Sequence, residues 1–101
     1  MEIVVSNDTP EQLEAPDEFG RFAIVVSSGA VRNLDGALEG IARIEDGTHA
    51  WVSPQAVRKL AAREDDPAWN GRFDAMLAFA ADRGWLASDG AIRAHIDFRE
   101  G

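Results

Sequence analysis

The sequence has no cysteine and no tyrosine, and no long hydrophobic run. Without cysteine the chain forms no disulfide, carries no thiolate nucleophile and has no cysteine-ligated zinc site. Its longest apolar run, residues 22–26, is far too short to span a bilayer. Residues 1–12 lack the basic region and apolar core of a signal peptide. These absences predict a soluble, cytoplasmic protein with no membrane partner.

Sequence motifs of enzymatic chemistry are also missing. The chain contains no glycine-rich phosphate loop, no GxSxG nucleophile elbow, no HExxH metal motif and no EF-hand spacing. We therefore expect no cofactor, and a binding or structural domain is a better interpretation than an enzyme.

Positive charge is scarce. Lysine and arginine contribute 10 residues against 18 acidic ones, for a net charge of −8. Residues 1–19 hold six acidic residues and no basic one, and we expect 7–19 to form an acidic loop or a short helical turn opened by Thr9 and Pro10. A chain of this sign repels phosphate backbones, so no nucleic-acid partner is expected. Abundant alanine, and arginine in place of lysine, suggest a GC-rich coding sequence and a bacterial source.

Helices are predicted over residues 54–63 and 67–83. Ser53 and Asp66 are capping residues, and each precedes a proline at the first helical position. Gly84 is typical of a helix end in the left-handed conformation. The second helix places Trp69, Phe73, Met76, Leu77 and Ala80 on one apolar face, with Phe79 at its margin.

Strands are predicted over residues 2–6, 22–27, 49–52 and 91–98. The strand at 22–27 is apolar on both faces, which is typical of a central strand. The strand at 91–98 alternates, which predicts that Ile92, Ala94, Ile96 and Phe98 face inward and that Arg93, His95, Asp97 and Arg99 face outward.

Residues 34–52 admit two interpretations. Leu34, Leu38 and Ile41 recur at helical spacing, which favours a helix over residues 34–44. Asp46 and Gly47 form the dipeptide that a hairpin turn prefers, so a hairpin is the alternative. With the helix, the element order is ββαβααβ. It predicts one domain, residues 1–101, of the α+β class: a compact two-layer sandwich of about four short strands with helices on one face.

The candidate site residues are few. His95 and Asp97 lie two apart on one strand, an arrangement that can orient a general base and makes them the candidate catalytic pair. If the strand at 49–52 pairs with the one at 91–98, His49 joins them in a two-histidine, one-carboxylate set of the kind that binds a metal. The alternative is a solvated strand face with cross-strand charge pairs.

Three tryptophans are prominent in so short a chain. Trp69 lies on the apolar helix stripe and Trp85 follows a helix end, so both are expected in the core. Trp51 shares a strand face with His49, and these two are the candidate ligand-binding or interface residues.

The predicted function is a small non-catalytic domain that acts through contacts with a protein partner or through self-association. One alternative is a small-molecule or metal-binding domain, or an enzyme, that uses His49, His95 and Asp97. A second is a winged-helix DNA binder, which the acidic turn at residues 64–66 disfavours.

Overall fold

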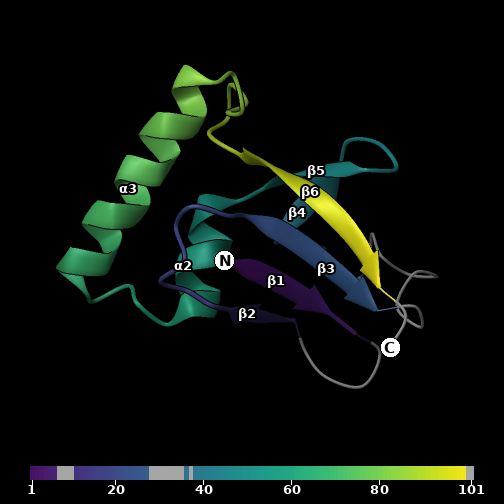
Figure 1. Ribbon diagram of the computed structural model, residues 1–101, viewed down its shortest axis with the longest axis horizontal. Coiled ribbons are helices and arrows are strands. Elements are labelled where there is room, and N and C mark those ends of the chain that lie inside the picture. The colour runs from purple at the N-terminus through teal and green to yellow at the C-terminus, as the bar shows by residue number, and fades with distance from the viewer. Residues whose placement is uncertain (7–10, 28–35, 37, 100–101) are drawn as a thin grey trace.

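The computed structural model describes residues 1–6, 11–27, 36 and 38–99 of the chain (Figure 1). Over these ranges it is an α+β protein with one six-stranded mixed sheet and two helices, as the class prediction requires. The elements in chain order are β1 (Glu2–Val5), β2 (Gln12–Glu14), β3 (Ala23–Ser27), β4 (Ala42–Ile44), β5 (His49–Val52), α2 (Pro54–Ala61), α3 (Pro67–Asp82) and β6 (Ile92–Arg99). No helix in the described ranges is long and apolar enough to cross a bilayer.

The sheet has the strand order β2-β1-β3-β6-β5-β4. Three parallel strands, β1, β3 and β6, lie next to one another, and antiparallel pairs complete both edges (Figure 1). The expected strands correspond to β1, β3, β5 and β6, and the apolar strand β3 is central as predicted. The expected number of four was too low, because β2 and β4 are short strands with little sequence signal.

Both helices begin at the predicted caps. The Ser53 hydroxyl accepts the N–H of Ala56 at 3.4 Å, and the Asp66 carboxylate accepts the N–H of Trp69 at 3.1 Å. At the end of α3, Gly84 has φ +77°, and the next N–H, of Trp85, donates to the Ala80 carbonyl at 2.8 Å. These local signals suffice to predict where both helices begin and where α3 ends, because capping satisfies backbone groups that the helix itself leaves unpaired.

The predicted helix over residues 34–44 is wrong over residues 38–44, which form a turn and then a strand, although Gly36 is helical. Residues 42–44 form β4, which pairs with β5 in the alternative hairpin around Asp46 and Gly47. The Asp46 carboxylate accepts the N–H groups of Thr48 and His49 at 2.8 and 2.9 Å, which builds the turn. Gly40, at φ +80°, ends the preceding turn. Residues 34, 35 and 37 lie outside the described residues.

The expected helical turn within residues 7–19 is also not found in the part of this segment that the structure describes, residues 11–19. Residues 12–14 form β2, and Leu13 lies opposite Ile3 and packs against the core. Pairing with β1 satisfies the backbone groups that a single helical turn would leave exposed. Residues 7–10, with the proposed cap at Thr9 and Pro10, lie outside the described residues.

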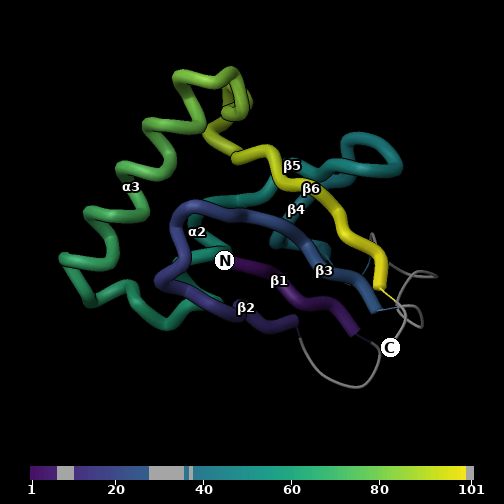
Figure 2. Tube along the Cα trace, in the orientation of Figure 1, coloured from purple at the N-terminus to yellow at the C-terminus, as the bar shows by residue number. Residues whose placement is uncertain are grey.

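The core lies between one face of the sheet and the helices. Trp69, Phe73 and Ala80 of α3 join the buried side chains of the strands, among them Ile24 and Ile96. In Figure 1, α2 lies behind the sheet, whereas α3 runs beside the end at which β1, β3 and β6 begin. The tube in Figure 2 shows the segment between β2 and β3 extending toward α3. Helix α3 therefore closes an end of the sheet, a position that the prediction of helices on one face did not include.

Strand β6 alternates largely as predicted. Ile92, Ala94 and Ile96 are buried, and His95 is exposed on the opposite face. Phe98 is in register with Val26 but is 48% exposed, so its predicted place in the core is wrong. It lies near the far end of the strand, away from α3 (Figure 1).

Candidate functional site

The two histidines meet on the face of the sheet opposite the core. His49 and His95 are direct register partners on β5 and β6, and their ring centroids are 5.4 Å apart in an edge-to-face arrangement. The condition stated for a shared site, pairing of these two strands, is thus met, and it brings the candidate rings together. The Nδ1 atom of His49 lies 2.8 Å from the Thr48 hydroxyl, which leaves its Nε2 atom for a ligand.

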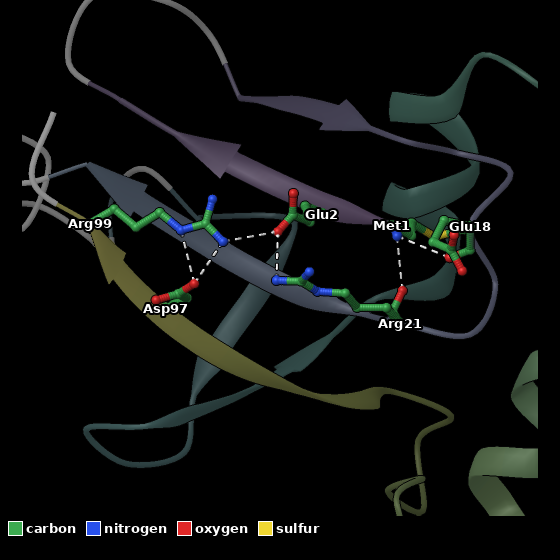
Figure 3. A network of polar contacts seen from close by, with 6 residues as sticks. All are labelled: Met1, Glu2, Glu18, Arg21, Asp97 and Arg99. Carbon is green, nitrogen blue, oxygen red and sulfur yellow. Dashed lines mark hydrogen bonds and ion pairs between the residues drawn. The ribbon is translucent and has the colours of Figure 1, made fainter.

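Asp97 does not complete a metal site with them. Its carboxylate lies 2.9 Å from the Arg99 guanidinium, which also reaches Glu2 at 3.4 Å. Arg21 contacts the same Glu2 carboxylate at 3.2 Å, so this face carries a chain of ion pairs across three strands (Figure 3). Among the described residues no group of three histidine or carboxylate side chains is placed to hold a metal ion. The arrangement is the cross-strand charge pairing expected of a solvated face.

The network ends at the start of the chain. The α-amino group of Met1 donates to the carbonyls of Glu18 and Arg21 at 3.0 and 2.9 Å (Figure 3). Partial burial lowers the pKa of this amino group. These bonds fix the segment between β2 and β3, which carries Phe19 and Phe22 toward α3.

Trp51 lies beside a small hollow. It is half-buried on β5, between Arg43 and Arg93 of the neighbouring strands, and the Arg43 guanidinium lies 6.0 Å from its ring centroid. The hollow has a volume of about 270 Å³ and is also lined by Asp89. The N–H of Ala91 and the Arg43 ion pair at 2.8 Å lower the pKa of Asp89. Because Arg43 and Asp89 neutralise each other, the hollow presents no unpaired charge to a ligand.

A larger groove lies between α3 and the start of β6. Its volume is about 570 Å³, and its apolar walls are Phe19, Phe22, Met76, Phe79, Trp85 and Ile92. A concave surface of this size lies within the range of ligand-binding pockets. Sequence analysis did not identify it, and it places Trp85 at the surface instead of in the core.

The groove exists because α3 turns Trp69, Phe73 and Ala80 toward the core, whereas Phe79 lies on another side of the helix and stays at the surface. Phe73 is fully buried and stacks on Trp69 with ring centroids 5.0 Å apart, and the Trp69 indole N–H donates to the Pro16 carbonyl at 2.8 Å. Phe79 and Trp85, at the other end, are 53% and 42% exposed and contact each other edge to face at 6.2 Å. Two large aromatic side chains are thus held at the surface.

Arginines border this groove. The Arg72 guanidinium lies over the Phe19 ring and that of Arg83 over the Phe79 ring, each 4.7 Å from the ring centroid. Arg21 and Arg93 also line the groove. Because Arg21 and Arg93 are paired with Glu2 and Glu45, the positive charge of the rim comes mainly from Arg72 and Arg83.

No protein-family model matches this chain, and neither a curated protein nor a solved structure is significantly similar to it. The function is therefore argued from the geometry of these surfaces.

Proposed function

We propose that this chain is a non-catalytic domain that acts through contacts with a protein partner, and that the groove beside α3 is its contact surface. The observation that supports it is the exposure of Phe79 and Trp85 along an apolar groove. Exposed aromatic clusters of this kind are typical of interface anchors, since they bury a large apolar area with few rotatable bonds.

The groove favours a different protein over a second copy of this chain. A two-fold dimer through the groove would place the same surface on both sides of the interface. Arg72 and Arg83 of one copy would then lie close to the same arginines of the other, which is unfavourable. The groove therefore does not support the self-association that the sequence left open.

A random peptide library displayed on phage tests this function. We expect peptides to be enriched on the wild-type domain and lost on the double variant Phe79→Ser, Trp85→Ser. Phe98→Ser is the matched control, because Phe98 is 48% exposed and lies at the other end of β6. Circular dichroism would check that each variant is folded. Absence of enrichment, or equal binding to the double variant, would contradict the proposal.

The second candidate is a small-molecule or metal-binding domain, or an enzyme, that uses the open sheet face. The observation in its favour is the direct opposition of His49 and His95. The winged-helix alternative has less support, because β6 lies between β3 and β5 in the sheet instead of extending from it as a wing.

A further inference from the structure

The arginines at the groove differ from the others in their partners. Arg72 and Arg83 form no ion pair within the described part of the chain, although acidic residues outnumber basic ones. Elsewhere in that part, a carboxylate lies within 4.0 Å of every arginine: Arg21, Arg43, Arg58, Arg63, Arg93 and Arg99. The two guanidinium groups without a carboxylate are thus those stacked on aromatic rings of the groove.

The spacing of the two arginines places one at each end of the apolar stripe. From Arg72 to Arg83 the chain makes about three helical turns, so both lie on nearly the same side of α3, about 16 Å apart along its axis. Ala75, Met76 and Phe79 line the groove between them. The groove side of α3 is therefore an apolar stripe with an unpaired positive charge at each end.

We propose that the occupant of the groove is an extended segment of another protein in which aromatic or aliphatic residues lie between aspartates or glutamates. This inference rests on the proposed function and names the chemistry of the partner. An extended chain rises about 3.3 Å per residue, so carboxylates about five residues apart reach both arginines. A ligand with a single anionic group pairs with one arginine and leaves the other without a partner. Guanidinium groups bind carboxylates in a bidentate manner, which gives the contact its specificity.

The net charge of the domain does not oppose this pairing. At physiological salt, charges further apart than about 8 Å are largely screened. An acidic segment in the groove therefore interacts mainly with the arginines at the rim, and the remote acidic residues contribute little.

Three peptide libraries test the charge of the partner. All have Phe, Leu, Met or Trp at the same central positions, and the flanking positions are Asp or Glu in the first, Ser or Gln in the second, and Lys or Arg in the third. We expect the acidic library to be enriched most on the wild-type domain. On Arg72→Glu its advantage should disappear, and the dissociation constant of a selected acidic peptide should rise about tenfold.

Lys59→Glu is the matched control. It changes the net charge by the same amount, and Lys59 is an exposed residue of α2 that does not line the groove. The acidic library should remain enriched on this variant, and loss there would overturn the inference because it would show a general effect of net charge.

The outcomes separate the two proposals. Equal enrichment of the neutral or basic library overturns the inference about charge, while dependence on Phe79 and Trp85 leaves the proposed function intact. Equal binding to the variant lacking both aromatic residues overturns both. A dimer that sedimentation detects for the wild type but not for that variant overturns the inference, because the occupant is then a second copy.

Discussion

Phe73 and Phe79 lie six residues apart on α3, and the account predicts opposite consequences for their loss. Phe73 is fully buried and stacked on Trp69, so Phe73→Ala removes a core ring and leaves a cavity. Such substitutions cost about 3–5 kcal/mol, against about 5–15 kcal/mol for the unfolding of a whole domain. We expect a large loss of stability. If the free energy of unfolding of the wild type is about 5 kcal/mol, the variant is partly unfolded even without denaturant.

Phe79→Ser should have little effect on stability. Its ring is 53% exposed, and its contacts are the Trp85 ring at 6.2 Å and the Arg83 guanidinium at 4.7 Å. Exposed contacts of these two kinds contribute about 1 kcal/mol or less each. Urea denaturation measures the free energy of unfolding of both variants. A midpoint that shifts while the m-value stays unchanged reports a change in stability. If Phe79→Ser cost as much as Phe73→Ala, the Phe79 ring would belong to the core and the groove would not be a free surface.

Three further predictions concern other parts of the molecule. Gly84→Ala should lower the free energy of unfolding in urea by about 1 kcal/mol, because Gly84 has φ +77°; an unchanged stability would contradict this backbone argument. The N–H and hydroxyl of Thr48 lower the pKa of Asp46 below its ordinary value of 3.8, so the stabilisation by this carboxylate is present above that pH and lost as the pH falls through the lower folded-state pKa. We therefore expect Asp46→Asn to weaken the fall in thermal stability upon acidification, and an unchanged fall would refute this assignment. Added zinc should leave the NMR ring signals of His49 and His95 unchanged at equimolar concentration, whereas a joint 1:1 response would favour the metal-binding alternative.

The parts of the fold that the sequence predicts correctly depend on local interactions. The caps at Ser53 and Asp66 and the left-handed Gly84 act within a few residues, so the start of both helices and the end of α3 can be predicted from neighbouring side chains. The end of α2 came two residues earlier than expected, at a left-handed Ala62 that no glycine marks. The apolar run of β3 likewise predicts a central strand, because both faces of such a strand have to be covered.

The errors arise where tertiary pairing determines the conformation. The helical spacing extends over residues 34–44, but β5 offers residues 42–44 a backbone partner and Gly40 has a φ of +80°. Strand β5 is already held by its pairing with β6, and pairing with β5 outweighs the weak helical preference of the segment. Gly36 and Gly40 lower that preference further.

The candidate sites show the same division. The approach of His49 to His95 follows from a strand pairing that the sequence only offered as a condition, and the Arg99 partner of Asp97 depends on side-chain positions that periodicity does not contain. The exposure of Phe79 and Trp85 depends on the position of α3 at the end of the sheet. The only signal in the sequence was the place of Phe79 at the margin of the apolar face.

The most direct test of the central claim is a map of amide chemical shifts during titration with an acidic peptide selected on the wild-type domain. The account predicts changes confined to residues 19–22, 72–85 and 92–93, together with the indole N–H of Trp85. Changes centred on the open sheet face around His49 and His95, with the groove unaffected, would contradict it.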